Sequence, residues 1–525
     1  MESAPPIFAT PADATSRNLW LAAVLLLCCI RLWLMPLASS FWVDELVTSY
    51  VVQRGVADPS LRAAPQVGMS FYYALPGAAE SIFGFSETAY RLPSVLAMAL
   101  ALFLIARLAS RLIHPGAGWF AVFVCLGLRG FNYHAADARP YALGICLACL
   151  CFWLLVRWLD SARWRDALFF AVAASLLWRV HAAFWPLYIA FTLYVLVRLA
   201  RADSDVGWRS AAAVFALLGI SLLPVLSDAL ALHREGAAHV VVPRPSLLDL
   251  CRSLKLGFAV FCCAAAALLS RCFRWPRAPS VLAWTPLSLI LGWWLCHPLG
   301  LYAYSWITGN SVFTPRNLSV ALPGAALAIT AAAAPFIPAR RWKPLSAVLG
   351  LGVLLLLGHW NHLYPTHHNS DWRAAARALS LHTLGPDMPV ICPSPFIEAR
   401  SPEWRPDYPL PGFLYAHLLT YRIPGRIYPF PYETSPEAEI YAAEISRGSL
   451  TASDRFALYG PACSIHFRSN WLAARPELAG WRIRRLGPFG DVDVVLFEKA
   501  PAAAPARVPI KGTCGSIAVS TCFDG

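Results

Sequence analysis

The chain has 525 residues, of which 58% are hydrophobic and only 14% are charged. Soluble domains average about 25% charged residues, so this chain could not cover its apolar surface in water, and lipid is the expected solvent. The net charge of +13 does not indicate nucleic-acid binding, because the excess of Lys and Arg lies in short stretches between apolar runs. The length also exceeds a single hydrophobic core, so at least two units are expected.

Residues 1–363 contain about eleven apolar runs that are long enough to cross a bilayer, which takes roughly 17–25 residues. They lie near 19–38, 92–112, 117–133, 139–157, 166–182, 183–200, 210–231, 254–270, 281–300, 317–337 and 344–363. The first run could alternatively be a cleaved signal peptide, but it is long for one. The sequence therefore predicts a polytopic α-helical membrane domain over 1–363.

The basic residues predict the orientation of this domain, because short cytoplasmic loops are enriched in Lys and Arg. One set of alternate loops is short and basic, with Arg107/Arg111, Arg157/Arg163/Arg165, Arg198/Arg201/Arg209, Arg271/Arg274/Arg277 and Arg340/Arg341/Lys343. We therefore predict a bacterial inner-membrane protein with a cytoplasmic N-terminus. The loop 39–91 and everything after residue 363 would then be periplasmic.

The last third of the chain reads as a soluble domain. It is rich in Pro and charged residues, with a helical start at 371–377 and strand-like runs at 388–392 and 492–497. These features predict a periplasmic α/β domain over 364–500, followed by a loosely ordered Ala/Pro-rich tail over 501–525. Four cysteines in an oxidising compartment permit disulfides, which we predict as Cys392–Cys463 and Cys514–Cys522.

Candidate functional residues gather in the segments predicted to face outward. Asp44 and Glu45 follow the first span, where they could be catalytic carboxylates or cap an interfacial helix. The segment 132–141, Asn-Tyr-His-Ala-Ala-Asp-Ala-Arg-Pro-Tyr, brings His134, Asp137, Arg139 and Tyr141 into one short turn. An Asp137–Arg139 ion pair of purely structural role is the alternative there.

Two further candidates lie between later spans. His181 follows the fifth span, where a lone His is more often structural than a ligand. Arg316 opens the tenth span, and an Arg there suits either a phosphate or an interfacial anchor. Together the carboxylates, His and Arg are the residue types needed for a reaction on a phosphate-bearing lipid at one membrane face.

The order of these motifs resembles the GT-C superfamily of glycosyltransferases, in the branch of protein O-mannosyltransferases and the aminoarabinose transferase ArnT. The resemblance covers the chain to about residue 499. It rests on Trp42-Val-Asp-Glu45, Tyr90-Arg-Leu-Pro-Ser94, Asp137-Ala-Arg-Pro-Tyr141, His181, Pro315-Arg316, Leu322-Pro323, Asp371-Trp-Arg-Ala-Ala and Val-Val-Leu-Phe-Glu-Lys499.

The resemblance implies an inverting glycosyltransferase that uses a polyprenyl-phosphate-linked sugar at the periplasmic face. Asp44 would be the general base, with Glu45 or Asp137 orienting the acceptor or a cation. The substrate-binding candidates are Arg91, Arg139, Tyr141, His181 and Arg316, with Arg139 and Arg316 on the lipid phosphate.

The sequence departs from that branch in ways that affect specificity. Residues 66–73 read Gln-Val-Gly-Met-Ser-Phe-Tyr-Tyr, without the His-Pro-Pro or Pro-Pro-Leu-Tyr of many relatives. Asp137 stands where Glu is common, and Asn317 where Tyr is frequent. The sugar and the acceptor, which could be a lipid, a glycan or a protein, stay open. A divalent metal ion is possible, but no ligand spacing indicates one.

Two rival functions remain from the residues alone. A transporter or lipid flippase would explain the spans and the charges at membrane depth, but not the soluble domain or the acids gathered on one face. A non-catalytic subunit of an envelope-polysaccharide assembly is the other alternative.

Overall fold

The structure, a computed structural model, describes residues 18–68, 70–236, 242–276, 282–357, 365–383 and 385–499. The chain divides into two compact units. The helical unit comprises Met1–Ala38 and Pro65–His367, and the sheet unit comprises Ser39–Ala64 and His368–Gly525. The outward loop 39–91, predicted as one part of the membrane domain, is therefore shared between the two units.

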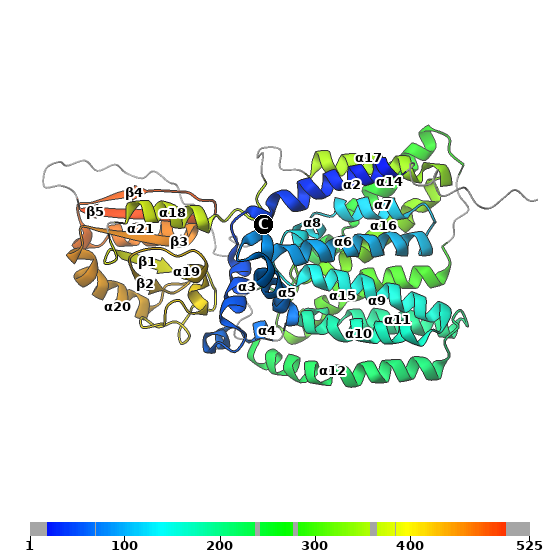
Figure 1. The fold of residues 1–525 in the computed structure, drawn as a ribbon, viewed down its shortest axis with the longest axis horizontal. Coiled ribbons are helices and arrows are strands. Elements are labelled where there is room, and N and C mark those ends of the chain that lie inside the picture. The colour runs from blue at the N-terminus through cyan, green and yellow to red at the C-terminus, as the bar shows by residue number, and fades with distance from the viewer. Residues whose placement is uncertain are drawn as a thin grey trace, which may run out of the picture. The chain divides into compact units, whose positions relative to one another are not determined.

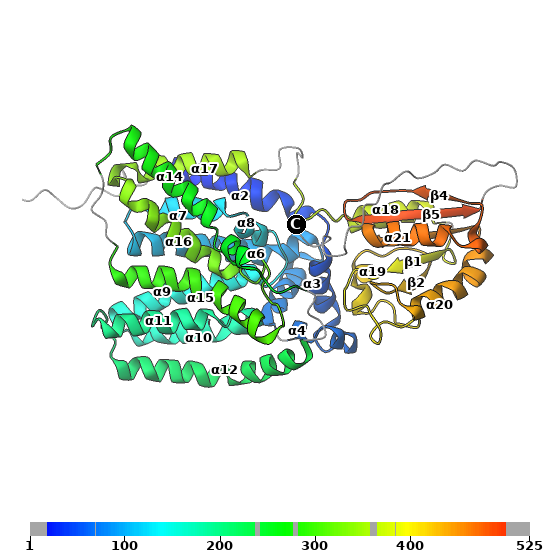
Figure 2. The same cartoon turned by 180° about the vertical axis from the view of Figure 1, so that it is seen from behind.

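The helical unit is a bundle in which the long helices lie side by side (Figures 1 and 2). Its described elements are α2 (Leu19–Cys29), η1 (Ile30–Leu34), η2 (Met35–Ala38), α4 (Pro65–Gly68), η4 (Phe71–Tyr73), α5 (Ala74–Phe83), α6 (Glu87–Leu112), α7 (Gly118–Gly127), α8 (Arg129–Ala135), α9 (Tyr141–Ser161), α10 (Trp164–Val180), η5 (Ala182–Phe184), α11 (Leu187–Ala200), α12 (Trp208–Gly236), α13 (Leu247–Ser253), α14 (Leu256–Cys272), α15 (Trp284–Thr308), η6 (Ser319–Ala321), α16 (Leu322–Ala333), η7 (Ala334–Phe336), η8 (Ala339–Arg341) and α17 (Trp342–Leu356).

Apolar side chains on the outside of the bundle indicate a lipid environment. Leu96 and Phe103 on α6 and Ile220 on α12 are each at least 60% exposed, and soluble monomers rarely display large contiguous apolar patches. Among the described residues, six helical segments are long and apolar enough to cross a membrane, or seven if the bent pair α13 and α14 forms one span. Each predicted apolar run overlaps a helix where it is described, but several are interrupted: the run 117–133 is divided between α7 and α8 at Leu128. The predicted count of about eleven spans stays a prediction.

Close packing at α9 positions the turn that follows α10. A side chain at Gly144 of α9 would collide with the ring of Phe184 in η5. Phe184 is itself fully buried. The absence of a side chain at Gly144 therefore lets η5 pack directly on α9, which fixes the segment that begins at His181.

The sheet unit contains a five-stranded mixed sheet in the order β2-β1-β3-β5-β4. β1 pairs in parallel with β2 and β3, whereas β5 is antiparallel to β3 and β4. The described elements are α3 (Val43–Arg54), η3 (Pro59–Ala63), α18 (Trp372–His382), β1 (Pro389–Pro393), η9 (Phe413–Tyr415), α19 (Ala416–Thr420), β2 (Arg426–Phe430), α20 (Pro436–Ile445), η10 (Ser446–Leu450), β3 (Arg455–Pro461), α21 (Ala462–Ala473), η11 (Pro476–Leu478), β4 (Trp481–Arg485) and β5 (Val492–Lys499).

The sheet core explains the strand-like runs in the sequence. Alternate residues of the paired strands β3 and β5, among them Phe456, Leu458, Val495 and Phe497, pack into one buried cluster. The prediction of a C-terminal α/β region is thereby confirmed. The predicted tail over 501–525 lies outside the described residues.

The segment 39–64 is part of the sheet unit because its backbone and side chains contact residues of the C-terminal third of the chain. The Phe41 N–H donates to the Tyr421 hydroxyl at 2.7 Å. The Trp42 indole stacks on the His368 ring, with centroids 5.0 Å apart and an interplanar angle of 7°. These contacts fix the start of α3 against the sheet unit.

The predicted Cys392–Cys463 disulfide is wrong in this structure. Cys392 lies in β1 with no exposed surface and keeps a free thiol. Its place in the central part of the sheet explains this, since Cys behaves there as a small apolar residue. The predicted Cys514–Cys522 pair lies outside the described residues.

Candidate active site

Asp137 is the centre of a polar cluster in the helical unit. It lies in the turn between α8 and α9 and is 1% exposed. The Ser94 hydroxyl of α6 donates to the Asp137 backbone carbonyl at 2.6 Å. The carboxylate lies 3.7 Å from His134 Nδ1 and 3.6 Å from His367 Nε2. Both separations exceed a direct hydrogen bond.

The two histidines keep Asp137 ionised. Burial raises the pKa of Asp137, but its interactions with His134 and His367 outweigh burial and hold the pKa well below its ordinary value. Asp137 therefore carries a full negative charge inside the protein at neutral pH. Buried carboxylates in that state usually orient a hydroxyl, an ammonium or a metal ion.

A row of aromatic rings links this carboxylate to the turn after α10. Tyr133 lies 4.4 Å from His367 between ring centroids. His134 lies 5.0 Å from Tyr141, and Tyr141 lies 5.3 Å from His181. The predicted residues Asp137 and Tyr141 of the segment 132–141 thus belong to one cluster with His181, which lies 40 positions after Tyr141 in the sequence.

His181 is held neutral within this cluster. Its Nδ1 accepts the Ala183 N–H at 3.2 Å at the start of η5. Burial first, and then the positive charges of Arg139 and Arg316, lower the pKa of His181 to about 3. Because the charges of Arg139 and Arg316 both act on the pKa of His181, the three side chains share one electrostatic environment. Two arginines beside a neutral imidazole form an environment that favours an anion.

Arg91 is engaged with the backbone of the first span. It is fully buried on α6, and its Nη1 donates to the carbonyls of Leu37 at 2.8 Å and Pro36 at 3.3 Å. These bonds satisfy carbonyl groups at the end of η2 and fasten it to α6. Its predicted substrate-binding role stays a prediction beside this structural one.

The other predicted carboxylates belong to the sheet unit. Glu45, the third residue of α3, is fully buried, and its carboxylate accepts the Trp42 N–H at 3.3 Å. That contact is a helix-capping interaction. Asp44 precedes it and is only partly buried. Glu45 therefore has the helix-capping role that the sequence offered as an alternative to catalysis. Asp44 is the carboxylate of this pair that solvent can reach.

His367 and Tyr133 belong to the cluster although neither is among the residues predicted from the sequence. In the sequence His367 follows the last apolar run, within the region predicted as the soluble domain, and Tyr133 ends the apolar run 117–133. The consecutive His367-His368 just beyond the last apolar run was the available signal. Two adjacent histidines at a domain boundary are unusual enough to be marked as candidate ligands.

Comparison with known proteins supports the interpretation of this fold. A family model for dolichyl-phosphate-mannose-protein mannosyltransferase matches residues 71–226. Two crystal structures of ArnT from Cupriavidus metallidurans match almost the whole chain. The one bound to undecaprenyl phosphate has a TM-score of 0.54 at 11% identity, covering 91% of this chain and 98% of that one.

The apo ArnT structure gives a TM-score of 0.53 at 12% identity, with 92% and 98% coverage. A search of curated protein sequences found no match. The fold is thus that of a polytopic helical membrane protein, as the sequence predicted, and it is similar to the fold of ArnT. Residues 71–226 are similar to the protein mannosyltransferases.

Proposed function

We propose that this protein is an inverting glycosyltransferase that moves a sugar from a polyprenyl-phosphate-linked donor to an acceptor hydroxyl. The observation that carries the proposal is the ionised, buried Asp137 in one cluster with two arginines, inside a GT-C fold. The structure of ArnT, whose fold this chain shares, was solved with undecaprenyl phosphate bound. A lipid phosphate is the kind of anion that the arginines suit.

The chemistry of the donor sets what the residues must do. A phosphate is a good leaving group, so the reaction needs a base for the acceptor but no strong acid for the donor, unlike glycoside hydrolysis. The acceptor oxygen attacks the anomeric carbon, the carbon–oxygen bond to the phosphate breaks on the opposite face, and the electron pair stays on the phosphate. Arg139 and Arg316 would stabilise the charge that grows there.

We assign the general base to Asp44. The acceptor hydroxyl must lose its proton as it attacks the sugar. Asp44 is partly exposed to solvent, whereas Glu45 is buried and its carboxylate accepts the Trp42 N–H at the start of α3. Asp137 would orient the acceptor or a cation, and Tyr141 and His181 would line the donor site. The neutral state of His181 makes it a hydrogen-bonding group rather than a second cation.

A divalent metal ion fits the donor set around Asp137. An imidazole and a carboxylate are ligands that suit Zn²⁺ and similar ions, and His367 Nε2 lies 3.6 Å from the Asp137 carboxylate. An ion there would polarise a bound oxygen. Metal analysis of the purified protein, and binding of Zn²⁺ compared with an Asp137→Asn variant, would test this without an activity assay.

The function is tested by reconstituting the full chain with an undecaprenyl-phosphate-linked sugar and measuring release of undecaprenyl phosphate, a product common to every acceptor. Mass analysis of glycolipids and glycans from cells with and without the gene identifies the sugar and the acceptor. We expect Asp44→Asn to abolish transfer, whereas Asp58→Asn, a change in the loop after α3, should not. Full transfer by a properly inserted Asp44→Asn variant would refute Asp44 as the base.

The same reconstitution separates the rival functions. Flux of a labelled lipid across vesicles without sugar transfer would indicate a transporter or flippase. Transfer that requires a second protein would indicate an assembly subunit. For the cellular setting, the basic loops lead us to propose a bacterial inner membrane, a cytoplasmic N-terminus and a periplasmic sheet unit.

A further inference from the structure

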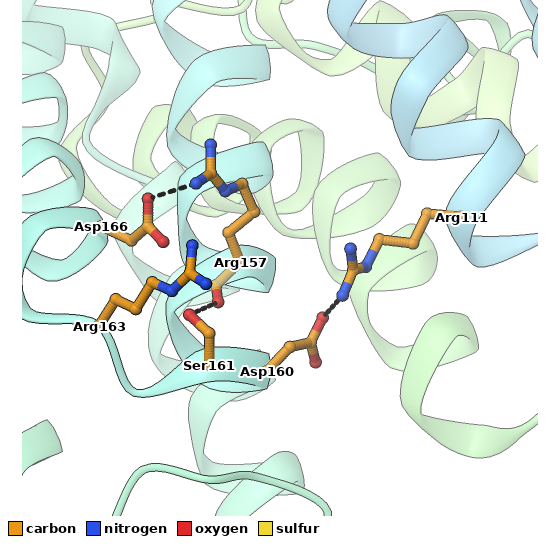
Figure 3. A pocket seen from close by; sticks show the side chains of 6 residues that line it. All are labelled: Arg111, Arg157, Asp160, Ser161, Arg163 and Asp166. Atoms are coloured by element: carbon orange, nitrogen blue, oxygen red, sulfur yellow. Dashed lines mark hydrogen bonds and ion pairs between the residues drawn. The ribbon is translucent and has the colours of Figure 1, made fainter.

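A second polar site lies in the helical unit among the Arg-rich connections, apart from the cluster around Asp137. A surface cavity of about 220 Å³ lies where α6 and α9 end and α10 begins. Figure 3 shows the side chains that converge there. They are Arg111, Arg157, Asp160, Ser161, Arg163 and Asp166.

The two carboxylates of the cavity already hold arginines. Asp166 is buried and lies 3.1 Å from Arg157, and Asp160 contacts Arg111 (Figure 3). Asp160 also binds Arg198 of α11 at 2.7 Å. These ion pairs fix the guanidinium groups in place, and their charges are mutually offset.

Arg163 supplies the uncompensated charge. Among the described residues it has no carboxylate partner, although it lines the same cavity. Three arginines against two aspartates leave one positive charge in the lining. Arg198 does not change that excess, because it also pairs with Asp203 at 3.7 Å. A pre-ordered, partly enclosed site with that excess favours an anion with several oxygens, and the planar guanidinium of arginine matches the geometry of a phosphate.

The surroundings of the cavity indicate that the anion belongs to a lipid. Trp164, the next residue along, is 69% exposed, and the Arg165 guanidinium lies over its ring at 5.9 Å. Exposed Trp beside Arg is typical of the headgroup level of a membrane. One turn further along α10, Leu168 and Phe169 are 44% and 57% exposed, so acyl chains would lie directly below the cavity.

We propose that this cavity binds the headgroup of an anionic glycerophospholipid, with its phosphodiester on Arg163 and Arg157. Basic pockets between helices at a membrane surface bind anionic headgroups in this way. The site does not depend on the proposed glycosyl transfer. It would fix the ends of α6, α9 and α10 to the lipid surface.

The test uses the full chain in detergent, with native mass spectrometry of added dioleoyl phosphatidylglycerol, and dioleoyl phosphatidylcholine as the neutral probe. We expect one tightly held phosphatidylglycerol, and Arg163→Gln should weaken it about five- to tenfold because one arginine–phosphate contact is lost. Arg165→Gln, two residues away and outside the cavity lining, is the matched control and should weaken binding less than Arg163→Gln. Arg163→Lys should weaken binding less than Arg163→Gln.

Three results would overturn the proposal. Equal binding of phosphatidylcholine would show that charge is not recognised. Competition by inorganic phosphate at similar concentration would indicate an anion site rather than a lipid site. If Arg165→Gln and Arg163→Gln lost the same affinity for phosphatidylglycerol, general surface charge rather than the cavity would explain the binding.

Discussion

His417 makes the sheet unit sensitive to acid. It lies on α19 with no exposed surface, and neither ring nitrogen has a hydrogen-bond partner among the described residues. The rings of Trp372 and Tyr459 pack against it with centroids 4.7 and 5.7 Å away. Burial among these rings lowers the pKa of His417 to about 3.

The size of the effect follows from that pKa. His417 titrates near its ordinary value of about 6.5 when the unit is unfolded. Between pH 6.5 and 3 the unfolded chain therefore binds a proton that the folded unit excludes, and stability falls as the pH falls. At pH 5.0 the loss is about 2 kcal/mol, since each pKa unit corresponds to about 1.4 kcal/mol, and at pH 7.5 it is close to zero.

Replacing His417 by Leu, which has a similar volume, removes this titration. We expect the melting temperature of the sheet unit to fall on going from pH 7.5 to 5.0 by about 4–8 °C less in His417→Leu than in the parent. Tryptophan fluorescence reports the transition because Trp372 contacts the ring. The difference between the two pH responses isolates His417 from every other titrating group. An equal fall in melting temperature in both proteins would refute the conclusion that His417 is buried and neutral.

Three further predictions follow from the structure. Asp137→Asn should lower sugar transfer at least about a hundredfold, because a buried charge among histidines is lost; polyprenyl-phosphate release measures it, and full activity would contradict the role. Arg91→Gln should lower the free energy of unfolding by about 2 kcal/mol through the lost carbonyl bonds, measured by thermal melting. Gly490→Ala should disrupt the sheet unit, because φ is +67° and the new side chain would collide with the Asn369 carbonyl. In Gly480→Ala φ is also positive, at +83°, but the new side chain would meet no neighbouring atom. This variant should lose less unfolding free energy than Gly490→Ala, by more than about 1 kcal/mol in the same melting assay.

The elements that the sequence predicted well are those dominated by one physical signal. Apolar length identified the helical runs because lipid requires every backbone group to be bonded within the segment. The short run of Val, Leu and Phe at 492–497 identified β5, because these residues favour strands and are buried in the sheet unit. The polar segment 132–141 already contained His134, Asp137 and Tyr141, and the fold adds His181 to them through its ring contact with Tyr141.

The features that sequence reasoning missed depend on long-range contacts. Nothing near Phe41 indicates that its N–H would bind Tyr421, some 380 positions later. His367 is next to the soluble domain in sequence, yet its ring lies on Tyr133 in the helical unit. Cys392 could not be distinguished from a disulfide partner because its burial depends on where β1 lies in the sheet.

The docking of 39–64 changes what the C-terminal third contributes to the proposed reaction. A separate covering domain could be removed without disturbing residues of the loop 39–91. Here the start of α3, which carries Asp44, is fixed by Tyr421 and His368 of the sheet unit. A chain ending at 367 would keep Asp44 but lose both contacts, and α3, at 12 residues, is marginally stable alone in water. If Asp44 is the base, the sheet unit takes part in the chemistry by holding it.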